Sequence, residues 1–282
     1  YLEEGGLAGE LCSFWVLIFF TQECLVGALT VESISKTFDA VRAVDGISLS
    51  VPEGQIYGML GPNGAGKTTM IRMILGIFEP DSGAIRYGQN GVAPPPDRVG
   101  YLPEERGLYT RMRVLDVLTF LGEIKSMSRL EAREKGKSWL DRFEMPEWAD
   151  RPVEQLSKGM QQKVQFISTV LHDPDLLVLD EPFSGLDPIN TALMKDVILE
   201  LKEAGKTLIF STHQMEEAER LCEKICLINK GQKVLEGGVA EVKARHGRNR
   251  VVLAFRGDDG FLKDETLVKR ADNYGQYVEV EL

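Results

Sequence analysis

The segment Gly61–Thr69 constrains this chain more than any other part of its sequence. It reads Gly-Pro-Asn-Gly-Ala-Gly-Lys-Thr-Thr, follows a strand-like apolar run at Gln55–Leu60 and leads into a helix-like run at Met70–Leu75. A strand, a glycine-rich loop that ends in Lys-Thr, and a helix, in this order, are typical of a phosphate-binding loop. The plainer alternative is a turn that only joins a strand to a helix. The complete motif favours an α/β domain that binds a nucleoside triphosphate.

The residue types of this loop suit the chemistry of a triphosphate. Glycines allow the backbone to curl so that several N–H groups converge on phosphate oxygens, and the N-terminus of the following helix adds a favourable dipole. Lys67 is expected to reach the β and γ phosphates, and the Thr68 hydroxyl to bind Mg²⁺. The residues predicted to bind the nucleotide here are Gly61, Pro62, Asn63, Gly64, Ala65, Gly66, Lys67, Thr68 and Thr69.

Two further apolar runs predict buried parallel strands. Leu176–Leu179 leads into an acidic pair, and Thr207–Phe210 leads into a Ser-Thr-His sequence. Continuous apolar runs are typical of strands that helices cover on both faces, and a helix predicted over residues 190–204 provides the crossover. Because ligands bind at the carboxyl ends of strands in open α/β sheets, the polar residues after both runs are predicted to face the nucleotide.

Two of these polar side chains complete a predicted catalytic set with Lys67, and a third is predicted to hold the metal. Asp180 would hold the water shell of Mg²⁺, and Glu181 would act as the general base on the attacking water. His213 could contact the γ-phosphate and orient that water, although a single histidine is more often a structural residue. The predicted catalytic residues are therefore Lys67, Glu181 and His213.

The rest of the chain predicts two additions to the α/β core. Alternating apolar residues between Leu29 and Val51 suggest short antiparallel strands before the loop, with Phe38 at the end of the first strand. Phe38 is either a core aromatic or a platform for a purine base. From Glu104 to about Leu171 the apolar spacing is helical, which predicts a helical insertion.

Both ends of the chain differ from its middle. Residues 1–28 contain a short apolar run, Phe14–Phe20, which cannot span a bilayer, and they lack the Lys or Arg of a secretory signal. Because the chain begins with Tyr1, we expect a native start near Val26 and an extension before it that is not native. At the other end, strand-like alternation predicts a small α+β domain over residues 248–282, which we expect to be truncated.

Composition narrows the classes of protein further. A hydrophobic content of 43% and a charged content of 27% exclude a disordered chain, and a formal net charge of −10 gives no overall basic footprint for nucleic acid. The cysteines show no paired zinc-ligand spacing, and Cys222 and Cys226 are predicted to lie in one helix. We therefore expect reduced thiols, and no nucleic acid among the partners.

These motifs, with two more segments, resemble the ATP-binding-cassette (ABC) ATPase family. Leu156–Gln162, which reads Leu-Ser-Lys-Gly-Met-Gln-Gln, is similar to the signature motif of that family, and Ser184–Pro188 is similar to its D-loop. Phe38 falls where the adenine-stacking aromatic of the family sits. The resemblance implies ATP and Mg²⁺ as cofactors. It also implies a P-loop NTPase with a RecA-like core, an antiparallel β subdomain and a helical insertion over residues 29–240.

The resemblance further implies that two subunits share each site. In the family, the signature motif contacts the γ-phosphate of ATP bound to a partner cassette. Ser157 and Gly159 precede a predicted helix, whose N-terminus suits that contact, and Asp187 of the D-loop is implied to belong to the same ATP-binding set. Two copies would then close head to tail around two ATP molecules as a C₂ homodimer.

Two positions depart from the family pattern. Glu104 stands where the family usually has a glutamine that touches Mg²⁺ and water; it could still bind the metal, but it adds negative charge beside phosphate. Lys158 replaces the usual glycine of the signature. Together with the sequence Glu104–Tyr109 and the small C-terminal domain, these departures resemble the ATPase subunits of bacterial ABC-2-type exporters, including the sodium-exporter branch.

The sequence therefore predicts an ATPase subunit at the cytoplasmic face of a cell membrane that drives a separate permease, with residues 104–118 as its implied docking surface. One alternative is a cytosolic mechanical ATPase that acts on nucleic acid or ribosomes, but such relatives usually carry two cassettes or a long coiled coil. Another is a nucleotide-dependent binding module without turnover, which the presence of Glu181 and His213 disfavours.

Overall fold

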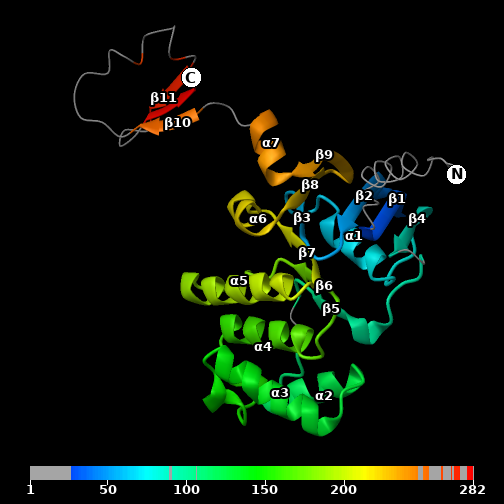
Figure 1. Cartoon of the computed structure of the whole chain (residues 1–282), viewed down its shortest axis with the longest axis vertical. Coiled ribbons are helices and arrows are strands. Elements are labelled where there is room, and N and C mark those ends of the chain that lie inside the picture. The colour runs from blue at the N-terminus through cyan, green and yellow to red at the C-terminus, as the bar shows by residue number, and fades with distance from the viewer. Residues whose placement is uncertain are drawn as a thin grey trace, which may run out of the picture.

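The computed structural model describes residues 27–88, 91–105 and 107–246, and near the C-terminus residues 250–253, 262, 268, 270–273 and 278–281. In the main body, helices cover one face of a central sheet, and a second sheet lies beyond its other face (Figure 1). This arrangement confirms the predicted α/β fold class. The predictions for the first 26 residues lie outside the described residues.

The central sheet is mostly parallel. Its strands are β3 (Ile56–Leu60), β5 (Val99–Leu102), β6 (Leu176–Asp180), β7 (Thr207–Thr212), β8 (Lys224–Asn229) and β9 (Gln232–Gly238). Their spatial order is β5-β6-β7-β3-β8-β9, and only the pair β8 and β9 is antiparallel. Every residue of β3, β6 and β7 is buried, as continuous apolar runs require of strands covered on both faces.

Most of the helices lie on one face of this sheet, and the first of them lies on the other face, beside the second sheet. The helices are α1 (Lys67–Ile74), α2 (Val114–Ile124), α3 (Arg129–Arg142), α4 (Lys158–Val170), α5 (Pro188–Glu203), α6 (Met215–Leu221) and α7 (Val239–His246), with short 3₁₀ turns η1 (Pro96–Arg98), η2 (Pro146–Trp148) and η3 (Val153–Gln155). Among the described residues, no helix is both long enough and apolar enough to cross a bilayer.

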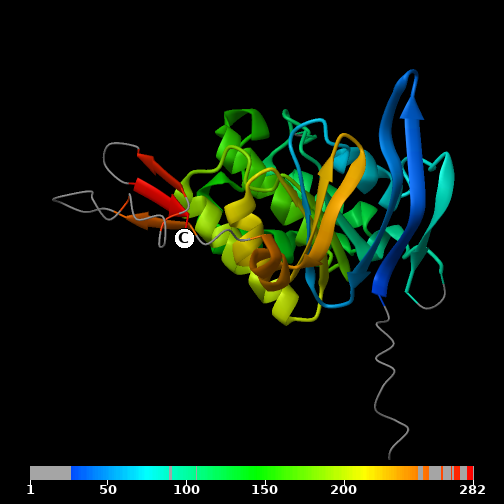
Figure 2. The same ribbon diagram turned by 90° about the horizontal axis from the view of Figure 1, so that it is seen from above.

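Two hydrophobic cores result from the alternation of side chains along the strands. Leu177 and Leu208 point into a core formed with α2, α4, α5 and α6, whereas Val178 and Ile209 point into a core formed with α1 and the second sheet. Seen from above, the blue β1–β2 region and the green and yellow helices lie on opposite sides of the molecule (Figure 2). The central sheet is thus fixed from both faces.

The second sheet is the predicted antiparallel addition. It contains β1 (Gly27–Phe38), β2 (Val41–Pro52) and β4 (Ser82–Tyr87), in the order β2-β1-β4. The strands β1 and β2 are longer than expected, because bulges in their pairing allow them to continue where the apolar alternation breaks. Phe38 ends β1 with 40% of its surface exposed and meets Phe78 edge to face at 5.5 Å. It is therefore not a buried core residue.

The register of the central sheet brings the predicted polar residues to one edge. Leu60 of β3 pairs with Thr212 of β7, and Asp180 of β6 pairs with Ser211. The loop after β3 and the segments that begin with Glu181 and His213 therefore leave the sheet side by side, as predicted for the carboxyl ends of parallel strands.

The region between β5 and β6 is helical, as predicted, and its core depends on Leu115. Leu115 of α2 is 2% exposed and belongs to the large core. We expect Leu115→Ala to lower the free energy of unfolding by about 2–5 kcal/mol, the usual cost of truncating a buried leucine. Urea denaturation followed by circular dichroism measures this change. Leu130→Ala, at an exposed position of α3, should cost less than about 0.5 kcal/mol; equal losses for both variants would contradict the assignment of the core.

One sequence prediction about local structure is wrong. Cys222 and Cys226 do not share a helix: α6 ends at Leu221, and Cys226 lies in β8. A spacing of four residues fits a helix but also fits a helix end followed by a strand. Both thiols are free and buried, and burial raises the pKa of each to about 12. Burial therefore disfavours the reactive thiolate form of both side chains.

The C-terminal part contains a strand that the sequence did not indicate. The strands β10 (Arg250–Leu253) and β12 (Val278–Glu281) match the predicted alternation, but β11 (Arg270–Asn273) lies in the stretch expected to be turns. They form an antiparallel sheet in the order β10-β12-β11. The other parts of the predicted domain fall largely outside the described residues.

Candidate active site

A cavity of about 530 Å³ opens at the carboxyl edge of the central sheet. It brings together segments far apart in the sequence: the glycine-rich loop, the ends of β5 and β6, the start of β2 and the turn between β8 and β9. The lining residues are Val41, Arg42, Ala43, Asn63, Gly64, Ala65, Gly66, Lys67, Thr68, Thr69, Glu104, Asp180, Glu181, Lys230 and Gly231. Most of the predicted nucleotide-binding residues therefore share one cavity.

The glycine-rich loop can take its shape only with glycines at two points. A Cβ atom on Gly61 would lie 2.2 Å from the carbonyl oxygen of Ile228, and one on Gly66 would lie 2.4 Å from that of Ala43. Gly66 also has φ of 106°, a conformation that favours glycine, and it caps the N-terminus of α1. The loop thus ends with the free N–H groups of a helix turned toward the cavity, which suits an anion.

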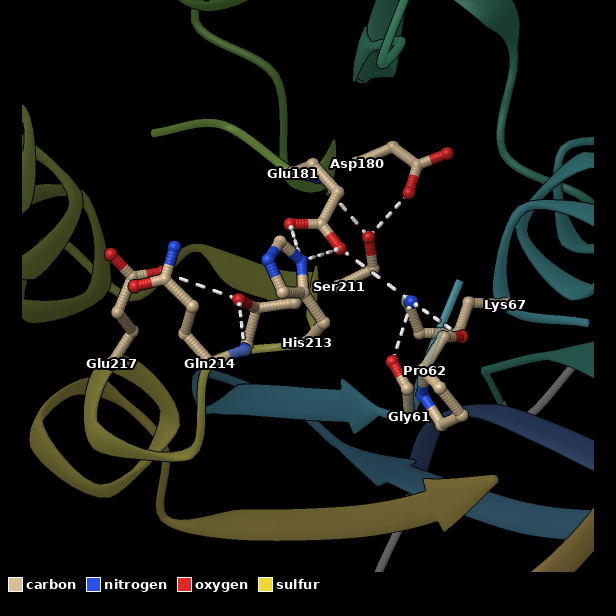
Figure 3. Close-up of polar contacts among 10 residues, drawn as sticks. Gly61, Pro62, Lys67, Asp180, Glu181, Ser211, His213, Gln214 and Glu217 are labelled. Carbon is tan, nitrogen blue, oxygen red and sulfur yellow. Dashed lines mark hydrogen bonds and ion pairs between the residues drawn. The ribbon is translucent and has the colours of Figure 1, made fainter. Parts of the chain in front are cut away.

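Lys67 begins α1 and lies in the middle of the site. Its Nζ donates hydrogen bonds to the carbonyl oxygens of Gly61 at 2.8 Å and Pro62 at 3.3 Å, and it lies 3.5 Å from Oε1 of Glu181 (Figure 3). The side chain is buried, so its charge is compensated by these partners. The ammonium group is therefore held at the cavity wall beside the carboxylate predicted to be the base.

Glu181 follows β6 in a strained position. Its φ is 49°, which is uncommon for a residue with a Cβ, and its N–H is held by the carbonyl and hydroxyl oxygens of Ser211, both at 3.2 Å. The residue is 8% exposed, and both carboxylate oxygens lie 3.0 Å from Nδ1 of His213 (Figure 3). Strain of this kind persists where the surroundings fix a side chain, and here it directs Glu181 into the cavity.

His213 directly follows β7, and its side chain contacts Glu181. The hydroxyl of Thr212 donates to Oε2 of Glu217 at 3.2 Å and accepts from the N–H of Gln214 at 3.0 Å. These bonds fix the backbone on both sides of His213. The sequence predicted that this histidine is close to the catalytic water; the structure adds a direct contact with Glu181, for which residue spacing gave no signal.

Asp180 has the features of a metal-shell residue. It is fully buried; one oxygen accepts a hydrogen bond from the Ser211 hydroxyl, and Oδ2 has no partner among the described residues. Thr68 and Glu104 line the same cavity. Oxygen donors of this kind fit Mg²⁺, which binds a few protein groups and completes its shell with water and phosphate. Accordingly, the described residues contain no cluster of three or more His, Cys, Asp or Glu side chains.

The ATP-binding residues predicted from the signature motif and the D-loop lie outside the lining of this cavity, as do Gly61 and Pro62 at the start of the glycine-rich loop. Ser157 caps α4, and its hydroxyl accepts from the N–H of Met160 at 3.2 Å. Gly159 lies against Gly185, where an added Cβ would be 3.3 Å from the carbonyl oxygen. Asp187 caps α5, and hydrogen bonds, led by that from the N–H of Asn190, hold the pKa of its carboxyl below the usual range. One copy of the chain does not bring the residues of these two motifs to the glycine-rich loop.

Sequence reasoning missed part of the cavity wall. Arg42, Ala43, Lys230 and Gly231 line the cavity, and the N–H of Gly231 donates to the carbonyl of Ala65 at 2.9 Å. The turn at Lys230-Gly231 is visible in the sequence as a glycine turn, but nothing in it shows that it meets a loop far earlier in the chain. Phe38, by contrast, was predicted to be near the nucleotide but does not line the cavity.

Comparison with known proteins agrees with this geometry. Residues 44–184 match the family model described as ABC transporter. The ABC transporter ATP-binding protein YhaQ of Bacillus subtilis is 47% identical over 83% of this chain and 79% of its own length. The chain belongs to the ABC transporter ATP-binding proteins. It is therefore an ABC ATPase cassette that binds ATP, which confirms the family, fold and enzyme class expected from the sequence.

Other members of the ABC family extend the comparison. The Nod factor export ATP-binding protein I of Paraburkholderia xenovorans is 36% identical over 88% of this chain and 84% of its own length. Among solved structures, the ATP binding subunit of an ABC transporter superimposes with a TM-score of 0.71 at 29% identity, covering 78% of this chain and 93% of that one. The likeness to the solved cassette therefore extends over most of this chain.

Proposed function

We propose that this chain is the ATP-hydrolysing subunit of an ABC exporter, and that it dimerises on ATP to drive a separate membrane permease. The observation that carries this proposal is the convergence of Lys67, Asp180 and Glu181 on one cavity, at the carboxyl ends of strands of the central sheet, with His213 in contact with Glu181. A cassette that only bound ATP would not need a buried carboxylate held between a lysine and a histidine.

Each residue of this set has a defined task in the proposed reaction. Lys67 binds the β and γ phosphates, Glu181 takes a proton from the attacking water, and His213 orients Glu181 and the water at the γ-phosphate. Asp180, Thr68 and Glu104 would hold Mg²⁺, which when bound neutralises charge on the β and γ phosphates. Phe38, exposed at the end of β1, is free to stack on the adenine base.

The second half of each ATP site comes from another copy of the chain. Ser157, Gly159 and Asp187 lie on the surface at the N-termini of α4 and α5, away from the cavity of their own copy. A C₂ dimer arranged head to tail would bring them to the γ-phosphate of the partner. We therefore propose a homodimer with two composite ATP sites that opens after hydrolysis.

The proposed permease contact is centred on exposed aromatic residues. Tyr109 is 51% exposed and meets Phe120 of α2 edge to face at 5.5 Å, and Ile124, one turn after Phe120 on α2, is also exposed. Leu115, by contrast, belongs to the core, so the implied docking segment 104–118 contains buried residues as well. Through this contact the chain would lie at the cytoplasmic face of the membrane. We also propose that the sheet of β10–β12 is a small domain distinct from the cassette.

A pull-down assay tests the docking surface. We expect the double change Tyr109→Ala and Phe120→Ala to reduce capture of the permease by about tenfold or more, the effect of losing a central aromatic pair from an interface. The ATPase rate of the isolated variant should stay within about twofold of the wild type, since neither residue touches the cavity. Full capture of the permease by this variant would exclude the surface.

Phosphate release by the purified chain tests hydrolysis itself. A colorimetric phosphate assay with Mg²⁺ and ATP should show turnover that saturates with ATP and stops when Mg²⁺ is chelated. No release of phosphate by a folded chain that binds ATP would favour a binding module instead. Export is proposed because the relative from Paraburkholderia xenovorans is named for export of Nod factor; transport in inverted membrane vesicles measures the direction.

A further inference from the structure

The helix α4 reaches two loops of the ATP site with adjacent glutamine side chains. Gln162 is buried, and its Nε2 donates to the carbonyl oxygen of Pro182 at 2.9 Å, directly after Glu181. Gln165, one turn further along α4, faces the segment after β5. The same helix begins at Ser157, the cap residue of the signature motif. It therefore contacts the Glu181 segment and the Glu104 segment at once.

The amide of Gln165 brackets Glu104. Its Nε2 donates to the carbonyl oxygen of Pro103 at 3.3 Å and to that of Glu105 at 3.1 Å. These are the residues on either side of Glu104, which lines the ATP cavity. A side-chain amide has two N–H donors, so one group can hold both peptide units. A side chain of α4 therefore holds the backbone on both sides of Glu104.

The buried position of Gln165 indicates that this residue serves to make these two hydrogen bonds. The residue is 4% exposed, and its Oε1 is buried without a hydrogen-bond partner among the described residues. An unpaired buried oxygen is unfavourable, and an apolar side chain would avoid it. On the next turn, Thr169 Oγ1 lies 3.3 Å from the carbonyl oxygen of Tyr101, so α4 follows the whole segment from β5 to Glu105.

We propose that Gln165 is a positioning residue that fixes Glu104 at the ATP cavity and links the Glu104 segment to α4. Because Gln162 holds the segment after Glu181, a movement of α4 would displace Glu104 and Glu181 together. The inference rests on the proposed role of Glu104 at the Mg²⁺-ATP site. It adds a route by which the signature helix acts on the site of its own copy.

The substitution Gln165→Met tests this proposal, because methionine is similar in length and apolar but cannot donate. We expect kcat for ATP to fall by about tenfold, the scale of misplacing a site group by a fraction of an ångström, with KM within about twofold. Hydrogen exchange at the backbone amides of residues 101–105 should become faster. Gln165→Asn, which keeps the amide but withdraws it by one methylene, should show the same changes.

Ser168→Ala is the matched control on the same helix. Its hydroxyl donates only to the carbonyl of Gln165 within α4, at 2.7 Å, so kcat and exchange at residues 101–105 should be unchanged. In the background of Glu104→Ala, Gln165→Met should lower kcat by less than about twofold, because residues that act as a unit are not additive. An additive loss, or exchange equal to that of the wild type, would overturn the proposal.

The exchange measurement separates this inference from the proposed function. If the wild-type chain does not hydrolyse ATP, or if Glu104→Ala leaves kcat unchanged, the proposed role of the site or of Glu104 fails. Faster exchange at residues 101–105 in Gln165→Met would then still show that Gln165 holds this segment. Unchanged exchange with normal hydrolysis in the wild type would remove Gln165 alone.

Discussion

Glu181→Gln is expected to bind ATP and to form the dimer, but to hydrolyse ATP at least about 10²-fold more slowly than the wild type, the scale of losing a general base. Glutamine keeps the size of the side chain and can still contact His213, which lies 3.0 Å from the carboxylate. It cannot accept a proton from water. Single-turnover kinetics with radiolabelled ATP measures the chemical step directly.

The neighbouring acidic residue provides a comparison for this variant. Asp180→Asn removes the charge of a buried carboxylate that is proposed to hold Mg²⁺ and not to act as the base. A higher Mg²⁺ concentration should therefore partly restore the rate of ATP hydrolysis in this variant. The loss in Glu181→Gln should not respond to Mg²⁺. Turnover of Glu181→Gln at the wild-type rate would remove Glu181 from the proposed reaction.

Lys67→Ala is expected to abolish both ATP binding and ATP-dependent dimer formation. The Lys67 ammonium, which lies at the cavity between the loop carbonyls and Glu181, is the group predicted to reach the β and γ phosphates. The variant loses a charge-assisted contact to phosphate, and it also loses the positive charge that balances the Glu181 carboxylate. Together these losses should weaken ATP binding by about 10²-fold or more. Isothermal titration calorimetry with ATP measures this loss.

A second buried lysine controls for the loss of a buried charge. Lys163 on α4 is as buried as Lys67, but its Nζ donates to Oδ1 of Asn190 at 2.8 Å and it does not line the cavity. Lys163→Ala should therefore keep ATP affinity within about threefold, since it removes no phosphate contact. If Lys67→Ala still dimerised on addition of ATP, the link between nucleotide binding and assembly would be broken.

The central sheet and the loop could be predicted from the sequence because their signals are local. The apolar runs at Leu176–Leu179 and Thr207–Phe210 are short, continuous and followed by polar residues, which leaves few alternatives to a buried parallel strand. The shape of the loop at Gly61–Thr69 depends on its glycines, which are visible in the sequence. Because both runs were predicted to be parallel strands, Glu181 and His213, which follow them, were expected at the same edge of the sheet.

Contacts between distant segments could not be predicted in the same way. Nothing in the spacing of Gln165 indicates that it brackets Glu104, and nothing in Lys230-Gly231 indicates that this turn closes the loop around Ala65. Cys226 was wrongly predicted to share a helix with Cys222, since a spacing of four residues fits a helix but also fits other structures. These positions are determined by the packing of α4 on the central sheet and by the places of β8 and β9 within that sheet.

Light scattering of Glu181→Gln with ATP tests most directly that one copy completes the ATP site of another. The mass should double with ATP, and it should remain that of one chain when Ser157→Arg is added, although ATP is still bound. Ser128→Arg, at the matching cap of α3, should leave the doubling intact. A dimer that forms equally well with Ser157→Arg would contradict a site shared head to tail.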